Sequence, residues 1–110
     1  MSGRASKVKG SRFETETVHL FQEHGVAAER VPLSGAAGGS YTGDVTIPVF
    51  GKDVKLECKR RAAGFKTIYG WMGDNYALVV RDDRCPPLAI LRAEDLARLI
   101  YAAGVMTWEG

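Results

Sequence analysis

The chain has 110 residues, of which 45% are hydrophobic and 25% are charged, and its formal net charge at pH 7 is +2. This length and balance predict one globular domain over residues 1–110, with enough apolar side chains for a single core. No apolar run is long enough to span a bilayer, and the N-terminus lacks the apolar core of a signal peptide. We therefore expect a cytoplasmic protein that does not contact a membrane.

Basic side chains are concentrated in two places along the chain. The first twelve residues hold four of them and no acid, and a second group follows Cys58; the members are Arg4, Lys7, Lys9 and Arg12, then Lys59, Arg60, Arg61 and Lys66. Such groups are typical of a surface that holds the phosphates of a polyanion. The alternative is ordinary solvated surface. Residues 1–9 are small, polar and basic, and we expect them to form a flexible tail.

The first third of the chain predicts a helix, a strand and a glycine-rich loop. Ser11 and Glu14 have the spacing of a capping box, and an apolar stripe continues to a natural stop at Gly25. Residues 26–33 are typical of a strand. The segment 34–43 is rich in glycine, which suits either a loop that approaches a phosphate backbone or a simple connection.

Residues 44–59 predict a β-hairpin with one apolar and one polar face. Apolar and polar side chains alternate on both sides of Gly51-Lys52, which suits a two-residue turn of type II′. In this register Val49 pairs with Val54. Cys58 then falls on the apolar face, where a core role is the simplest interpretation of a thiol. Both carboxylates of this stretch, Asp44 and Glu57, fall on the polar face with Lys59.

The rest of the chain predicts a helix over 62–73, strands over 76–80 and 88–91, and a helix over 94–101 that ends before Gly104. The element order is therefore α-β-β-β-α-β-β-α, and the predicted class is α+β, with a central mixed sheet flanked by helices. The helix over 62–73 is unusually rich in large apolar side chains, which suggests a subunit interface formed by Phe65, Ile68, Tyr69, Trp71 and Met72.

The polar face of the hairpin has the groups that metal-assisted phosphodiester hydrolysis needs. Two neighbouring carboxylates repel each other, and a divalent cation such as Mg²⁺ removes that repulsion and gains hard oxygen ligands. Lys59 lies beside them and is suited to orienting a water molecule or neutralising developing charge. The alternative interpretation is a cross-strand salt bridge between Asp44 and Lys59, which contributes ~0–1 kcal/mol.

Four short motifs together resemble the PD-(D/E)XK nuclease superfamily and, within it, the archaeal and phage Holliday junction resolvases. They are K-G-S-R-F-E (Lys9 to Glu14), R-V-P-L-S-G (Arg30 to Gly35), G-D (Gly43-Asp44) and E-C-K (Glu57 to Lys59). Their order and spacing agree with that family over about the first 60 residues, whereas residues 62–110 agree only in the order of elements. One difference is Gly43, where the superfamily has proline.

The resemblance implies a restriction-endonuclease-like fold and a role for each matching residue. Asp44, Glu57 and Glu14 would bind the metal, Lys59 would assist the nucleophilic water, and Ser34 would lie near the scissile phosphate. Arg30 and the two basic groups would hold the DNA backbone. The cofactor would be Mg²⁺, for which Mn²⁺ substitutes. From the residues alone, the favourable place of Glu14 in the first turn of a helix explains it better than a catalytic role does.

As a member of the resolvases, the protein would be a homodimer that cuts four-way DNA junctions by paired nicks during recombination and repair, in a prokaryotic or phage-infected cell. Two alternatives stay open: a nuclease of the same superfamily that acts on other branched, nicked or single-stranded DNA, and a catalytically silent DNA-binding module. His19 and His24 have no partner at metal-ligand spacing, and we interpret both as surface residues.

Overall fold

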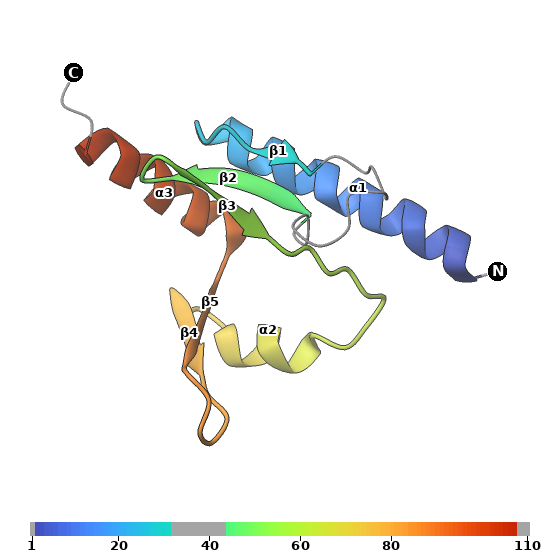
Figure 1. Ribbon diagram of the computed structural model, residues 1–110. Coiled ribbons are helices and arrows are strands. Elements are labelled where there is room, and N and C mark those ends of the chain that lie inside the picture. The colour runs from blue at the N-terminus through green and yellow to red at the C-terminus, as the bar shows by residue number, and fades with distance from the viewer. Residues whose placement is uncertain (1, 32–43, 108–110) are drawn as a thin grey trace.

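The computed structural model describes the backbone of residues 2–31 and 44–107 and the side chains of residues 12–31 and 44–104. In this part of the chain the α+β class and the order of elements are confirmed (Figure 1). The elements are α1 (Ser2–Glu23), β1 (Glu29–Arg30), β2 (Val45–Val49), β3 (Lys52–Leu56), α2 (Lys66–Met72), β4 (Ala77–Val80), β5 (Leu88–Leu91) and α3 (Ala93–Thr107).

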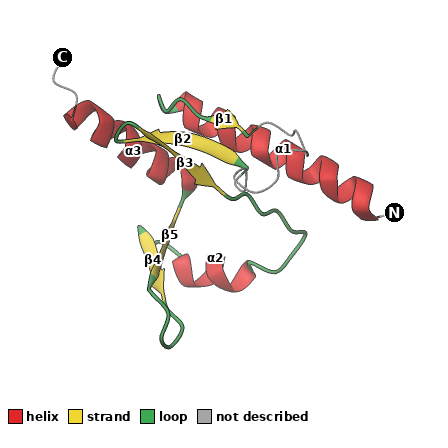
Figure 2. Ribbon diagram, viewed as in Figure 1, coloured by secondary structure: helices red, strands yellow, loops and turns green. Residues whose placement is uncertain are grey.

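The strands form two antiparallel sheets, so the predicted single mixed sheet is wrong for the described residues. One sheet has the order β1-β2-β3 and the other consists of β4 and β5. Figure 2 shows the β4–β5 pair with α2 to one side of the three-stranded sheet, and β5 leads directly into α3. Which strands pair is decided by contacts between distant residues, and the alternation within each strand carries no information about it.

The β2–β3 hairpin turns at Phe50-Gly51, one residue earlier than predicted. Val49 pairs with Lys52 and Ile47 with Val54, so the register is shifted by two residues from the predicted one. Phe50 has φ 50° and Gly51 has φ 80°, the two positive values that a type I′ turn requires. A shift of two residues preserves the alternation of faces, and the prediction of one inner apolar face therefore holds.

The core lies between the inner face of the three-stranded sheet and the helices α1 and α3. Its largest fully buried side chains are Phe21 of α1 and Val45 and Ile47 of β2, and Ala97 of α3 is also fully buried. Cys58 packs against this cluster, as predicted for the apolar face of the hairpin. Burying an aliphatic or aromatic side chain of this size contributes about 1.5–3 kcal/mol each.

Three predicted helix boundaries are corrected by the structure. The first helix begins at Ser2 and not at Ser11, so residues 2–9, predicted to be a flexible tail, are the first turns of α1. The last helix continues through Gly104 to Thr107, because one glycine costs only about 1 kcal/mol in a helix interior. The central helix is shorter than predicted and begins at Lys66.

The first strand begins later than predicted. Among the described residues 26–31 of the predicted strand, only Glu29 and Arg30 pair with β2, whereas Val26 and Ala28 are buried beside α1 without joining the sheet. Residues 32–43 lie outside the described part of the chain. Within the described residues, no helix is both long and apolar enough to cross a membrane.

Candidate active site

Asp44 lies immediately before β2, and three hydrogen bonds fix it there. Its backbone N–H donates to the carbonyl oxygen of Leu56 (2.8 Å), and its own carbonyl oxygen accepts from the N–H of Val31 (3.0 Å). Its side-chain Oδ2 accepts from the backbone N–H of Cys58 (2.8 Å). The carboxylate is therefore held at the open end of the hairpin, on the side where β3 leaves the sheet.

Glu57 and Lys59 follow β3 and stand two residues apart, on the outer side of the chain. The Lys59 Nζ lies 3.1 Å from Glu57 Oε2, and the exposed fractions of the two side chains are 72% and 50% respectively. The ion pair that forms here is thus Glu57–Lys59, whereas the sequence had suggested Asp44–Lys59. At this exposure it contributes ~0–1 kcal/mol, so either group can be drawn to another partner at little cost.

Glu14 reaches the same region from α1, but it is paired with a basic side chain. Arg30 Nη2 of β1 donates to Glu14 Oε1 at 3.0 Å. The Glu14 side chain is 17% exposed, so this carboxylate is better shielded from water than Glu57. Arg30 Nε is buried and lacks a hydrogen-bond partner among the described residues. An unsatisfied buried donor is rare and is often found where a group acts on a ligand.

Cys58 connects the core, α1 and the site. Its Sγ lies 3.7 Å from the hydroxyl oxygen of Thr17, which in turn donates to the carbonyl oxygen of Phe13. Burial raises the pKa of the Cys58 thiol above the ordinary 9.0, and the negative charges of Asp44, Glu14 and Glu57 raise it further. Three carboxylates from different parts of the sequence therefore act on one thiol.

Thr17 was missed by the sequence analysis. Its only signal is its spacing, because residues three apart share one face of a helix and Thr17 follows Glu14 by three positions. Val18 and Phe21 continue the same face into the core. The packing of this face against the sheet is what turns Glu14 and Thr17 toward the hairpin.

The three predicted metal-binding carboxylates all lie close enough to Cys58 to raise the pKa of its thiol, but they do not form a ready cluster. Among the described residues, no three His, Cys, Asp or Glu side chains are arranged to hold a metal ion. Glu14 is occupied by Arg30, which leaves Asp44 and Glu57 as the pair at the open end of the hairpin. Carboxylate oxygens are the donors that Mg²⁺ accepts, and this ion commonly uses one or two of them together with water and substrate phosphates. The donor chemistry of the pair fits such an ion.

The remaining predicted site residues are only partly within the described structure. Ser34 lies outside the described residues, and so do the side chains of Arg4, Lys7 and Lys9, although their backbone belongs to α1. Four other predicted DNA-binding side chains are exposed. They are Arg12 on α1 and, after β3, Arg60, Arg61 and Lys66. The roles of all these residues stay predictions. His19 is exposed, and His24 Nδ1 lies 2.8 Å from the carbonyl oxygen of Leu20.

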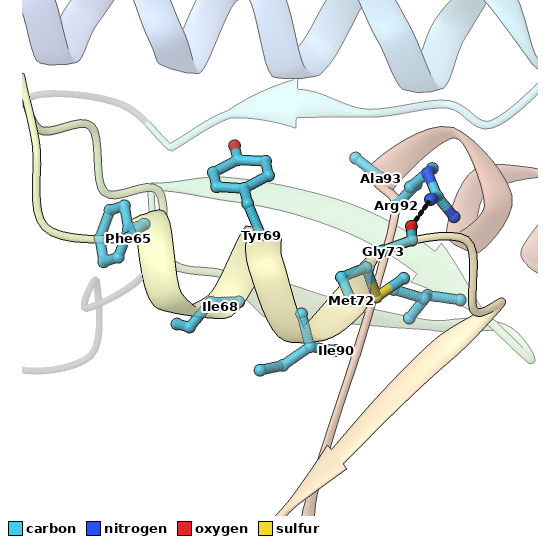
Figure 3. Close-up of a pocket in the computed structure, with 9 residues that line it drawn as sticks. Phe65, Ile68, Tyr69, Met72, Gly73, Ile90, Arg92 and Ala93 are labelled. Carbon is cyan, nitrogen blue, oxygen red and sulfur yellow. Dashed lines mark hydrogen bonds between the residues drawn. The ribbon is translucent and has the colours of Figure 1, made fainter.

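A separate apolar pocket lies between α2, β5 and the start of α3. It has a volume of about 310 Å³ and is lined by Phe65, which precedes α2, by Ile68, Tyr69 and Met72 of α2, and by Ile90 of β5 (Figure 3). Beside the pocket, Arg92 Nη2 donates to the carbonyl oxygen of Gly73 at 2.7 Å and fixes the end of α2. Tyr69 and Trp71 are 77% and 62% exposed, so this helix keeps much of its apolar surface uncovered.

Comparison with known families gives a match over most of the chain. The model of a family described as "Phage putative PDDEXK endonuclease" matches residues 5–74, which is more than half of the chain. The matched region runs from α1 to the end of α2 and includes Glu14, Asp44, Glu57 and Lys59; β4, β5 and α3 follow it. Comparison with curated proteins and with solved structures gives no match.

Proposed function

Because this chain belongs to the phage PDDEXK endonuclease family, we propose that it is a divalent-metal-dependent nuclease that cuts four-way DNA junctions. The nuclease class follows from the family. The metal, the branched substrate and the site residues are our proposal. The main support for the metal and the site residues is one observation: Asp44 and Glu57 share the open end of the hairpin, and Asp44 is held there by the backbone N–H of Cys58 at 2.8 Å. The junction as substrate rests on the resemblance to the resolvases.

Asp44 and Glu57 would hold the ion, and Mg²⁺ is the one that suits two carboxylates best. When bound, such an ion supplies Lewis-acid polarisation of the phosphate and makes a nucleophilic water available at neutral pH. The hydrogen bond from Cys58 uses one lone pair of the Asp44 carboxylate, which has about four such acceptor sites. The bond therefore orients this carboxylate and still leaves it able to bind a cation.

Lys59 would act on the substrate phosphate. Its ammonium group rests on Glu57 at 3.1 Å in an exposed pair that costs little to break, so Lys59 would be able to exchange Glu57 for a phosphate oxygen or for the attacking water. This exchange keeps one positive charge beside the reacting phosphate. It also explains how Glu57 and Lys59 can form an ion pair with each other in the structure and still have separate roles, Glu57 on the ion and Lys59 on the phosphate.

Glu14 and Arg30 would form the DNA side of the site. The 3.0 Å pair holds the guanidinium in place, and Arg30 presents further N–H donors in a planar fork that suits phosphate oxygens. In this arrangement Glu14 acts through Arg30, and it would be available as a metal ligand only if Arg30 exchanged it for a phosphate. Arg60, Arg61 and Lys66, on the segment that leaves β3, extend the basic surface.

A junction cutter needs two matched cuts, and one copy of this chain offers one candidate site. We therefore propose a homodimer, which supplies two sites by symmetry. The exposed apolar surface of α2 with its neighbouring 310 Å³ pocket is the proposed contact. Tyr69 and Trp71 are large, exposed and close in sequence, as is common for the central residues of an interface.

Cleavage of a synthetic four-way junction and of a linear duplex of the same sequence tests the proposal. Each DNA is incubated with wild type, Asp44→Asn and Glu57→Gln, in Mg²⁺ or in EDTA. Asp53→Asn is the matched control, because Asp53 pairs with Pro48 near the turn and loses the same charge on the same hairpin. We expect wild type and Asp53→Asn to cut the junction in Mg²⁺ only, and the other two variants to lose at least about 100-fold in rate.

Each result has a definite meaning. Equal cutting of duplex and junction would refute the junction as substrate and favour a less selective nuclease of the same superfamily. Cutting that persists in both site variants would refute the metal assignment. Binding of DNA by wild type without any cleavage would favour a silent DNA-binding module. Binding should also weaken steeply as salt rises, since several phosphate contacts release counterions.

A further inference from the structure

The turn of the β2–β3 hairpin carries an exposed aromatic ring on a strained backbone. Phe50 has φ 50°, a left-handed conformation that bulky residues rarely adopt, and its side chain is 69% exposed. Asn, Asp and Gly are the residues that favour this position of a type I′ turn. Phe50 therefore gains neither local conformational energy nor burial here. Residues with strained backbones cluster at active sites, ligand clamps and switch regions, so the strain at Phe50 suggests a functional contact.

The surroundings of the ring favour a nucleic acid base over a protein partner. Gly51, Lys52 and Asp53, which follow Phe50, are all exposed. A stable protein interface buries about 800 Å² on each partner, and one ring at a two-residue turn offers only a small part of that area. One face of a base, by contrast, is matched by one aromatic ring. Lys52, two residues after Phe50, is exposed and would be able to reach the phosphate of such a base, although the exposed Asp53 beside it offsets part of its charge.

We propose that Phe50 is a stacking residue that packs against an unpaired base of the bound DNA, at a distance from the cut. This inference rests on the proposed nuclease function. Asp44 and Phe50 lie at opposite ends of β2, six residues apart, which corresponds to about 20 Å along an extended strand (Figure 1). Since successive nucleotides of one strand are about 3.4 Å apart, the stacked base lies roughly six nucleotides from the cleaved phosphate.

The role predicts an unusual separation of stability from DNA binding. Phe50→Asn removes the ring and suits the left-handed backbone, so we expect the melting temperature to rise by about 4 °C or more. The same variant should bind DNA that contains an unpaired base about tenfold more weakly. Phe50→Leu keeps an apolar side chain without a ring and should show the same loss of binding, whereas Phe50→Trp should retain it.

The test uses a four-way junction with one bulged 2-aminopurine in an arm, a fluorescent base that is quenched when it is stacked, and the same junction without the bulge. Binding is measured in EDTA, so that no cutting competes. We expect wild type and Phe50→Trp to quench the bulged base, and Phe50→Asn and Phe50→Leu to leave it bright. All four proteins should bind the junction without the bulge equally. Among bulges at four, six, eight and ten nucleotides from the mapped cut, quenching should be strongest near six.

Two results would overturn the inference and leave the proposed function in place: equal quenching by all four proteins, or a change of oligomeric state in Phe50→Asn with unchanged affinity for the bulged DNA. The second would place the ring in a protein contact instead. Failure of wild type to bind either junction would overturn the proposed function together with this inference. Melting curves of each variant show that the loss of binding does not come from unfolding.

Discussion

The most informative substitution is at Asp44, because the structure gives its side chain a structural contact as well as a proposed catalytic one. Oδ2 accepts the backbone N–H of Cys58 at 2.8 Å in a partly buried position. Asp44→Ala leaves that N–H without its acceptor, whereas Asp44→Asn retains an oxygen at the same place. Both variants remove the charge that a divalent cation would need. Comparing them therefore separates the hydrogen bond from the carboxylate.

The expected magnitudes follow from the geometry. A hydrogen bond to a charged acceptor is worth about 1.5–3 kcal/mol, and one to a neutral acceptor about 0.5–1.5 kcal/mol. Asp44→Asn should thus be less stable than wild type by about 1 kcal/mol, and Asp44→Ala by about 2–3 kcal/mol. The backbone bonds of Asp44 with Val31 and Leu56 are the same in all three proteins. For a chain of this size 1 kcal/mol changes the melting temperature by about 4–8 °C, so the difference is measurable.

Urea and thermal melts with and without Mg²⁺ provide the assay, with Asp53→Asn as control. A cation that binds only the folded protein stabilises it by about 2.7 kcal/mol at one hundred times its dissociation constant. We expect this gain in wild type and in Asp53→Asn, and its loss in Asp44→Asn and Asp44→Ala. If Asp44→Ala and Asp44→Asn melt together, the bond to Cys58 contributes nothing. If Asp44→Asn keeps its gain from Mg²⁺, the carboxylate is not a ligand.

The remaining predictions concern the core, a helix end and the buried thiol. Phe21→Ala should lower the free energy of unfolding by about 3–5 kcal/mol in urea melts, since the ring is 1% exposed; a loss below 1 kcal/mol would contradict its place in the core. Gly25→Ala should destabilise by about 1–2 kcal/mol, because φ is +85° and a Cβ atom would lie 2.7 Å from the ring of Tyr101; an unchanged melting temperature would refute that close approach. The Cys85→Ser variant leaves Cys58 as the only thiol. Because the pKa of Cys58 is raised in the folded state, the folded protein keeps the thiol proton at pH values where the unfolded chain has lost it. The free energy of unfolding should therefore decline as the pH rises above 9.0. A Cys58→Ala partner shows whether that decline belongs to the thiol.

Strands were predicted well because alternation is a local signal. The apolar face of the hairpin was located correctly even though the turn was placed one residue late. Turn chemistry misled the prediction, because Gly51 is a good first residue of a type II′ turn and Phe50 is a poor one for the type I′ turn that forms. A strained residue at the turn has no signature in the sequence. The resulting error of two residues changed the partners but not the faces.

The pairings between distant residues could not be predicted from the sequence. Nothing in the local pattern indicates that Arg30 binds Glu14, sixteen residues earlier, or that β4 and β5 form a sheet of their own. The extension of α1 to Ser2 was missed for a different reason: residues 2–10 lack an apolar stripe, and the capping signal at Ser11 marked a later start. Helix ends depend on small energies that composition does not determine.

Cys58, the uncharged residue between Glu57 and Lys59, connects the parts of the candidate site. In the sequence E-C-K, the two outer residues face water and form an exposed ion pair, and the alternation of an extended chain turns Cys58 inward. Its backbone N–H holds Asp44, and its thiol contacts Thr17, which lies on the same helical face as Glu14. One residue therefore fixes the hairpin carboxylate and the helix that carries the third acid. The exposed side chains of Glu57 and Lys59 can exchange partners at little cost. The rigid part of the site is therefore the inner part around Cys58, and the adaptable part is the outer pair that would meet DNA.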